Sequence, residues 1–382
     1  MRVLHVVGDS RFGGGVFMVG SIADMAKGLG WEVDVLATDP LVQASFKRHG
    51  IGIVNLDSIH RPIDPIDDYR AYRILRKYLE LHPYDIVHTH TSKAGVLGRR
   101  AAYHANVPAI LHTVHGFAFH EESRFLSTLA YSTIERIASR WCDAIVTVSD
   151  FHKRWAENLG IAPPPKIHSI PNGMDPERVR ALTCRDVVRV SLGLSFDDIC
   201  ILSVGRLARQ KGLAYLLNAV PLLDRSIAAK CKVFLVGEGE MKGMLEHQSR
   251  RLRIQSKVNF LGFRRDIGDL LSAADIVALP SLWEGLSIAL LEAMAAGKPI
   301  VTTSIGSNVE VVSDDVEAMI VPPKDPQCLA DAVTRLALDR DKRERLGAAA
   351  RKRFENNYTL SRMQDGYREL YLSLVRAKGL VG

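Results

Sequence analysis

The chain has 382 residues, of which 47% are hydrophobic and 24% are charged. This composition is typical of globular proteins and excludes a disordered chain, and the length favours two domains. No apolar run is long enough to span a bilayer and the N-terminus does not resemble a signal peptide, so a cytoplasmic protein is expected. The net charge of +7 and a pI near 9.1 suit nucleic acid, an anionic membrane or a phosphorylated ligand without choosing among them.

The first half of the chain alternates predicted strands and helices. Residues 3–7 form a β-branched run, Gly13 to Gly15 form a turn, and apolar residues then recur at helical spacing between Val16 and Ala26. Further strands are predicted at 32–37, 86–88, 109–112, 144–148 and 167–170. This rhythm is typical of a parallel sheet covered by helices.

The same rhythm restarts in the second half. Prolines at 163–165 and the turn Pro171-Asn172-Gly173 mark the boundary. Strands are then predicted at 199–204, 232–236, 258–261, 276–279 and 300–303, and the tail 329–378 is predicted to be helical and basic. We therefore predict an α/β fold with two Rossmann-like doubly wound domains, 1–172 and 173–360, followed by a helix at 361–382.

The five cysteines lie far apart without C-x-x-C spacing, which indicates neither a zinc site nor a disulfide framework. We expect buried thiols at all five positions. They are Cys142, Cys184, Cys200, Cys231 and Cys328.

The richest stretch for chemistry follows the predicted strand 276–279. Glu284 lies in the loop, and a helix is expected to begin near Ser287, so that backbone N–H groups of Gly285 to Ile288 can bind a diphosphate. Glu292, one to two turns into this helix, can accept hydrogen bonds from a vicinal diol such as a ribose. The alternative is that Glu284 only caps the helix and Glu292 lies on a solvated helix face.

Basic residues follow the first strand of the second half. Arg206 and Lys211 can place a planar fork and a point charge on the same diphosphate and neutralise a leaving group. An exposed basic loop is the alternative, and it is the weaker one beside the two acids.

In this arrangement the chain resembles the family-4 glycosyltransferases of the GT-B fold, which are retaining enzymes with two Rossmann-like domains facing each other across a cleft. The motifs that match, in the family order, are Pro171-Asn172-Gly173, Gly205-Arg206 with Lys211-Gly212, Val236-Gly237-Glu238-Gly239, and Glu284-Gly285 to Glu292-Ala293. The resemblance implies an N-terminal acceptor domain, a C-terminal domain for a nucleotide-sugar donor, and a last helix that crosses back to the N-terminal domain.

The resemblance also implies roles for residues. Arg206 and Lys211 would bind the diphosphate, Glu284 the sugar hydroxyls and Glu292 the ribose, while Phe263 and Arg264 occupy the place of the nucleobase site. Gly14 and Gly15 would let backbone approach the phosphates, and His115 would reach the donor sugar. The expected catalytic residues are Glu284, His115, Arg206 and Lys211; the expected donor-binding residues are Gly14, Gly15, Gly205, Arg206, Lys211, Gly237, Phe263, Arg264, Glu284, Gly285, Leu286, Ser287 and Glu292.

The family mechanism needs no metal and no cofactor, and the leaving diphosphate helps to deprotonate the acceptor hydroxyl on the same face of the sugar. The implied reaction moves a hexose or N-acetylhexosamine, from a UDP-sugar first of all, to a glycan on a polyprenyl diphosphate in bacterial polysaccharide biosynthesis. His90, Ser92 and Lys93 would face the acceptor, Ser92 and Lys93 in a phosphate site. His88 and His90 can equally be plain strand-end residues.

A basic amphipathic stretch at 69–82 carries Arg73, Arg76 and Lys77 and would lie on an anionic membrane, at the inner face of the plasma membrane. An ordinary surface helix explains it equally well. Phe117, Phe119, Phe125 and Leu126 would meet the lipid, although core packing also accounts for them.

Other classes of protein fit less well. A dinucleotide oxidoreductase lacks its third glycine, because Met18 stands there, and Arg250, Arg251 and Arg253 accompany no nucleic-acid motif. A nucleotide-sugar epimerase of the same fold and a transferase with a soluble acceptor stay open as alternatives.

Overall fold

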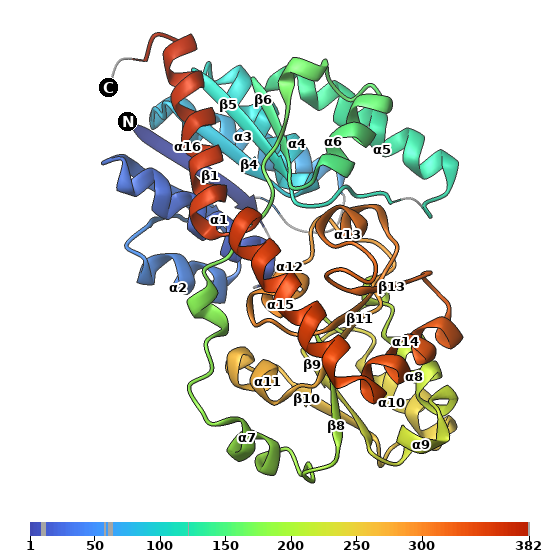
Figure 1. Ribbon diagram of the computed structural model, residues 1–382. Coiled ribbons are helices and arrows are strands. Elements are labelled where there is room, and N and C mark those ends of the chain that lie inside the picture. Colours follow the sequence, from blue (N-terminus) through green and yellow to red (C-terminus); the bar gives the residue numbers. More distant parts are fainter. Residues whose placement is uncertain (9–12, 57–58, 60–63, 121, 381–382) are drawn as a thin grey trace. The chain divides into compact units, whose positions relative to one another are not determined.

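The computed structural model describes residues 1–8, 13–56, 59, 64–120 and 122–380. The chain divides into two compact units (Figure 1). Unit 1 comprises residues 1–173 and 360–382, and unit 2 comprises residues 174–359. The two units are described separately.

Unit 1 contains a parallel sheet of seven strands within the described residues, in the order β3-β2-β1-β4-β5-β6-β7. The central strands are buried along almost their whole length, as is typical of a parallel sheet with helices on both faces. The strands are β1 (Arg2–Gly8), β2 (Glu32–Ala37), β3 (Gly52–Val54), β4 (Ile86–His90), β5 (Ala109–Val114), β6 (Ala144–Thr147) and β7 (Ile167–Ser169).

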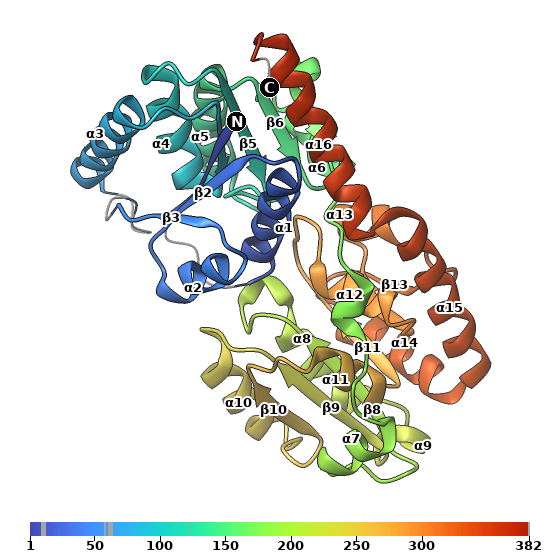
Figure 2. The ribbon, with the colours of Figure 1, turned by 90° about the vertical axis from the view of Figure 1, so that its left-hand side faces the viewer.

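The helices of unit 1 pack on the two faces of this sheet. Apolar residues of α3, α4 and α6 share one core with Leu4, Val6 and Val87. The C-terminal helix α16 packs against α1, where the Gln364 side chain donates to the Ser21 carbonyl over 2.9 Å (Figure 2). The helices are α1 (Gly14–Gly28), α2 (Pro40–Arg48), α3 (Pro65–Leu81), α4 (Ser92–His104), α5 (Phe125–Ala138), α6 (Asp150–Asn158) and α16 (Leu360–Ala377).

Unit 2 repeats the design with a parallel sheet in the order β10-β9-β8-β11-β12-β13. Its strands are β8 (Ile199–Val204), β9 (Cys231–Val236), β10 (Val258–Gly262), β11 (Ile276–Leu279), β12 (Ile300–Thr303) and β13 (Met319–Val321). Its helices are α7 (Arg185–Ser191), α8 (Leu213–Ala219), α9 (Arg225–Ala228), α10 (Lys242–Arg251), α11 (Ile267–Ala273), α12 (Ile288–Ala295), α13 (Gly306–Val311), α14 (Pro326–Leu338) and α15 (Arg340–Asn357).

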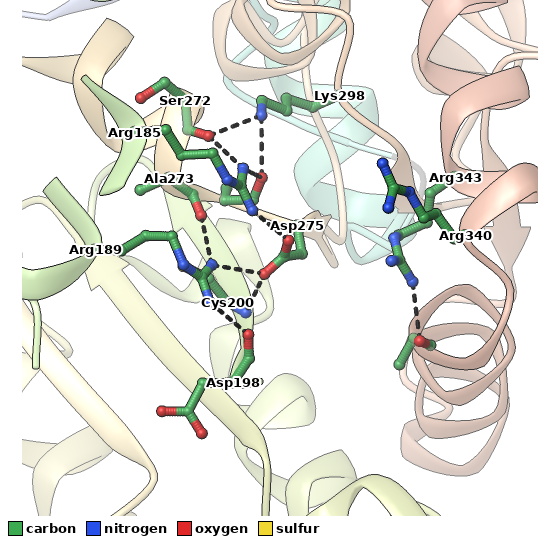
Figure 3. A network of polar contacts seen from close by, with 12 residues as sticks. Arg185, Arg189, Asp198, Cys200, Ser272, Ala273, Asp275, Lys298, Arg340 and Arg343 are labelled. Atoms are coloured by element: carbon green, nitrogen blue, oxygen red, sulfur yellow. Dashed lines mark hydrogen bonds and ion pairs between the residues drawn. The ribbon is translucent and has the colours of Figure 1, made fainter. Parts of the chain in front are cut away.

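A polar network ties α7 to the start of β11 (Figure 3). The Asp275 carboxylate accepts from Arg185 over 2.6 Å, from Arg189 over 2.9 Å and from the backbone of Cys200 over 2.8 Å. Arg185, Arg189 and Lys298 also donate to carbonyls of the last turn of α11, where the helix dipole favours positive charge. Because this network lies at the amino end of β11, it leaves the carboxyl ends of the strands open for a site.

The predicted fold class is confirmed: both halves are doubly wound parallel sheets. Four strands begin and end as predicted, whereas the three-residue edge strands β3 and β13 were not predicted. The prediction that all five thiols are buried is wrong for Cys184, which is exposed, and for Cys328, which is half-buried. Both lie beside helix starts at the surface and not in the sheets.

Candidate functional site

Three loops of unit 2 meet at the carboxyl ends of β8, β9 and β11. Glycines permit backbone to touch backbone there: a Cβ on Gly212 would stand 1.9 Å from the Pro280 carbonyl oxygen, and one on Gly237 would stand 2.0 Å from the Gly205 carbonyl oxygen. Gly212 has a φ of +62° and Gly237 a φ of +132°, which non-glycine residues rarely adopt. These glycines bring the loop 205–212 against the loop after β11.

Glu284 is buried where these loops meet. Its Oε1 accepts from Lys211 Nζ over 2.5 Å and from Ser281 Oγ over 2.8 Å, and its Oε2 accepts from Gln210 over 3.0 Å. The carboxylate is thus held in place by one charged donor and two neutral donors. The structure brings Lys211 and Glu284 together, and Lys211 does not lie in an exposed loop.

Glu292 lies one turn into α12 and is only 5% exposed, so it does not belong to a solvated helix face. Its carboxylate accepts from Arg178 Nε over 3.2 Å. Burial raises the pKa of Glu292, while the charges of Arg178 and Lys211 act in the opposite direction. A buried carboxylate close to two cations is suited to accept hydrogen bonds from ligand hydroxyls.

The start of α12 lies between the two acids. Ser287 is the N-cap, with its Oγ accepting from the backbone of Leu290 over 3.4 Å, as predicted for a helix that begins near Ser287. Gly285, Leu286 and Ser287 are buried. The positive end of the helix therefore points at the region between Glu284 and Glu292.

Other predicted donor residues lie apart from this cluster. Arg206 is exposed and pairs with Glu240 over 3.2 Å. Phe263 is exposed just after β10, and Arg264 pairs with Asp266 over 2.5 Å. Within the described part of the chain, Arg206 is bonded to Glu240 and Arg264 to Asp266, and neither is bonded to Glu284 or Glu292. A diphosphate or base would have to draw both arginines away from these partners.

In unit 1, Gly14 and Gly15 already belong to the first turn of α1, so the predicted turn ends at Gly13. A Cβ on Gly15 would meet nothing within 4 Å in the described part of the chain. Protein packing therefore does not demand a glycine there, which is compatible with close approach of a ligand to this helix start.

His115 follows β5 and is partly buried. Its Nε2 lies 3.1 Å from His90 Nδ1, and burial lowers its pKa to about 4. His90, which was predicted to face the acceptor, is fully buried at the end of β4, with its Nε2 3.0 Å from His5 Nδ1. β4 extends to His90, two residues beyond its predicted end, so this ring lies inside the sheet.

Ser92 and Lys93, which were predicted to form an acceptor phosphate site, both lie in the first turn of α4. Ser92 is the first residue of α4, and Lys93 forms an ion pair with Asp68, so its charge is already neutralised. Phe117 and Phe119 do not face outward: Phe119 is buried, and Phe117 stacks on it with ring centroids 5.0 Å apart, both against Trp155. Core packing therefore accounts for both phenylalanines.

The basic stretch forms α3, with Asp64 as its N-cap. Arg73 and Lys77 are exposed, and Arg76 pairs within the helix with Glu80 over 2.7 Å, whose negative charge offsets its own. Exposed Ile66, Tyr69 and Ile74 lie with Arg70 and Arg73 along a shallow groove of about 710 Å³. On α5, Phe125 and Leu126 are exposed by 78% and 75%.

Sequence reasoning missed three residues of the cluster in unit 2. Gln210 and Ser281 hold Glu284, and Arg178 holds Glu292. The first two flank motif residues and were within reach of sequence reasoning. Arg178 lies in an isolated 3₁₀ turn, 176–179, with no periodic pattern to reveal it.

Three buried histidines of unit 1, His5, His88 and His90, have ring nitrogens within 4.8 Å of one another, a spacing that could hold a metal ion. Both nitrogens of His88 are bonded, to Tyr371 over 2.7 Å and to Thr113 over 2.8 Å. Both nitrogens of His90 are bonded to other histidines. A cation would have to break these bonds.

Comparison with solved structures shows the fold. HepE of Anabaena, solved in complex with UDP-glucose, superimposes with a TM-score of 0.84 at 22% identity, covering 98% of this chain and 100% of HepE. The likeness shows that the chain has the GT-B fold.

Sequence comparison then defines the family. Residues 12–178 match Glycosyltransferase Family 4, and residues 185–353 match Glycosyl transferases group 1. The chain is 31% identical over 318 residues to the UDP-Gal:alpha-D-GlcNAc-diphosphoundecaprenol alpha-1,3-galactosyltransferase of Escherichia coli, covering 82% of each chain. It is 30% identical to the putative glycosyltransferase EpsD of Bacillus subtilis, over 89% of this chain and 90% of EpsD. The chain belongs to glycosyltransferase family 4.

Across the described residues, no helix combines the length and apolar character that a membrane span requires.

Proposed function

We propose that this glycosyltransferase moves a hexose or N-acetylhexosamine from a UDP-sugar, with retention and without a metal, to a hydroxyl of a polyprenyl-diphosphate-linked saccharide in bacterial polysaccharide biosynthesis. The observation that carries the donor assignment is the cluster in unit 2, where Lys211 pairs with buried Glu284 and also acts on buried Glu292. The two buried acids are suited to the hydroxyls of the sugar and the ribose. The lysine and the helix N-terminus are suited to the diphosphate between them.

Each residue of this cluster has a proposed role that follows from its chemistry. Lys211 and the N-terminus of α12 stabilise the negative charge that builds on the leaving diphosphate, and Arg206 joins them on leaving Glu240. Glu284 accepts from sugar hydroxyls and Glu292 from the ribose diol. The bond from the anomeric carbon to the diphosphate breaks, and the departing diphosphate oxygen takes the proton of the acceptor hydroxyl. The acceptor oxygen then bonds to the anomeric carbon on the face that the diphosphate leaves, so the configuration is kept.

Relatives support the donor and acceptor classes. The name of the E. coli relative specifies a UDP-galactose donor and an acceptor on diphosphoundecaprenol, and HepE is complexed with UDP-glucose. For the lipid, unit 1 offers the exposed apolar side chains of α5, including Phe125 and Leu126, and the groove of α3 with Arg70 and Arg73. An apolar surface beside basic residues is suited to the inner, anionic face of the plasma membrane.

A donor screen tests the proposed function. The full chain is incubated with UDP- and GDP-sugars, with and without bacterial membrane lipid extract and with EDTA throughout. We expect one UDP-sugar to be consumed in the presence of lipid, with the sugar recovered on a lipid product, and at least tenfold less product from Lys211→Ala and Glu292→Ala. Lys352→Ala and Glu344→Ala, on exposed α15, serve as charge-matched controls. Conversion of the UDP-sugar to its epimer without any acceptor, or unchanged activity in the two site variants, would overturn the proposal.

Vesicle sedimentation tests the membrane surface. Binding of the full chain to vesicles containing anionic lipid should weaken about tenfold or more when Arg73, Arg76 and Lys77 become Gln, since each nearby cation contributes about 1 kcal/mol. Phe125→Ser with Leu126→Ser should also weaken it. Phe196→Ser, an exposed phenylalanine of unit 2, is the control. Equal binding by all four proteins would remove α3 and α5 from the membrane contact.

A further inference from the structure

Three histidines of unit 1 form one hydrogen-bonded chain. His5 Nδ1 lies 3.0 Å from His90 Nε2, and His90 Nδ1 lies 3.1 Å from His115 Nε2. The sheet explains the juxtaposition: β1 and β4 pair with His5 opposite His88, and His88 and His90 share a face because side chains alternate along a strand. His115 follows β5, the next strand in the sheet.

The two ends of the chain are unusual. His5 Nε2 and His115 Nδ1 are both shielded from solvent, and neither has a hydrogen-bond partner in the described part of the protein. His5 is completely buried. The titratable groups next to these rings are His88 and His112. Tyr367 and Tyr371 of α16 face His88, and the charge of Arg99, which pairs with Glu135, acts on His112.

Burial keeps all three rings neutral at pH 7. It lowers the pKa of His5 to about 3 and that of His115 to about 4, and it lowers the pKa of His90 well below its usual value, with further lowering by the neighbouring histidines. A neutral imidazole has one N–H donor and one bare acceptor nitrogen. Each bond of the chain needs a single hydrogen, so the three rings must share one tautomer: all carry hydrogen on Nδ1, or all carry it on Nε2.

The two ends of the histidine chain distinguish the all-Nδ1 tautomer from the all-Nε2 tautomer. With hydrogen on every Nε2, His5 would bury an N–H donor without a partner, which folded proteins rarely tolerate. With hydrogen on every Nδ1, His5 leaves only a bare acceptor there, and the unpartnered N–H falls on His115 instead. His115 is only partly buried and lies just after the carboxyl end of β5, where a bound ligand can accept from this N–H, whereas no ligand can reach the completely buried His5. We propose that His5 and His90 are positioning residues that fix His115 as a neutral N–H donor to an oxygen atom of the bound substrate. This inference rests on the proposed function for the nature of that substrate, and it means that His115 does not serve as a general base.

The tautomers are measured directly, without substrate. Long-range ¹H–¹⁵N NMR of the full chain with ¹⁵N-labelled histidine, assigned by single His→Gln variants, should show a protonated Nδ1 and a bare Nε2 for His5, His90 and His115 at pH 7. A mixture of tautomers among the three rings, or hydrogen on Nε2 in all of them, would overturn the proposal. Because the spectrum needs no turnover, this result stands apart from success or failure of the donor screen.

Activity tests the positioning role. In His90→Leu the chain is cut, and kcat/KM for the donor should fall about tenfold, the effect of one misplaced hydrogen bond. In His90→Gln the amide oxygen accepts from His5 and the amide nitrogen donates to His115, so kcat/KM should stay within about threefold of the parent. Tyr371→Phe, which removes the hydroxyl bonded to His88 in the same core, should also stay within about threefold. If Gln fails as badly as Leu, or Tyr371→Phe fails as badly as either, the role is structural and the proposal falls.

Discussion

Arg178 opposes the effect of burial on the pKa of the Glu292 carboxylate. Burial raises the pKa of Glu292, and Arg178, 3.2 Å away, is the first of the charges that oppose this rise. Only the ionised Glu292 carboxylate can accept from both hydroxyls of a ribose through both of its oxygens, so binding of the nucleotide sugar weakens as the pH falls through the pKa of Glu292. Arg178, which belongs to none of the matched motifs, therefore helps to set the lower pH limit of binding.

Arg178→Met should raise the pKa of Glu292 further, since a nearby opposite charge lowers a carboxyl pKa by about 1 to 3 units. UDP affinity measured between pH 5 and 8 should then fall off at a pH about one unit higher than in the parent. Arg180→Met, which removes an exposed arginine from the same segment, is the control. Identical pH profiles for parent and Arg178→Met would show that Arg178 does not tune Glu292.

At the scale of elements, the loops after β8 and β11 depend on one left-handed glycine. Gly212 ends the loop that carries Lys211, and its missing side chain permits contact with the Pro280 carbonyl. Any side chain there would push the loop away from β11 and would separate Lys211 from Glu284. The effect on the site should exceed the effect on folding.

Two alanine variants separate strain from displacement. Gly212→Ala and Gly193→Ala both place alanine at a positive φ, of +62° and +70°, but a Cβ at Gly193 meets nothing within 4 Å among the described residues. Each should lower the free energy of unfolding by about 1 kcal/mol or more through strain. Only Gly212→Ala should also weaken UDP binding, by about tenfold; equal affinities in titration calorimetry would mean that the loop contact does not position Lys211.

At the scale of the whole molecule, the two units differ in their response to acid. Unit 1 holds His5, His88, His90, His112 and His115, all with pKa values lowered chiefly by burial. Unit 2 contains one histidine, His247. Below pH 6.5 these histidines bind protons in the unfolded chain but stay neutral in the folded unit 1. The stability of unit 1 is therefore complete above pH 6.5 and is lost as the pH falls.

Each such histidine costs up to about 1.4 kcal/mol per pH unit in this window. Glu292 in unit 2 acts in the opposite sense, because its raised pKa favours the folded state as pH falls. Urea unfolding followed by hydrogen exchange of peptides from both units, at pH 7.0 and 5.5, should show a larger loss of stability in unit 1. A larger loss in unit 2 would contradict the histidine burial.

Much of the fold could be predicted from sequence because buried parallel strands are continuous apolar runs bounded by turns. The strands at 199–204, 276–279 and 300–303 are examples. β3 and β13 have three residues each and lie at sheet edges, so they offer too short a run to be recognised. Periodicity reports burial along a segment, and it says little where the segment is short.

The candidate site was predictable where its residues share a loop or a helix. Lys211, Glu284, Ser287 and Glu292 follow strand ends in unit 2, and parallel topology brings strand ends together. The Arg178–Glu292 contact joins residues that are 114 positions apart in the sequence, and the His5–His90 contact joins residues that are 85 positions apart. Such pairings depend on strand register and on a loop path, which a local pattern does not encode.

UDP binding to the full chain tests the central claim most directly, because it asks whether the cluster around Lys211 is the donor site before any acceptor is known. Titration calorimetry should show one UDP per chain, with the Kd raised at least tenfold in Lys211→Met and in Glu292→Gln, as expected for loss of a charge-assisted hydrogen bond. Lys352→Met on α15 should bind like the parent. UDP bound equally by all four proteins, or by none of them, would contradict the account.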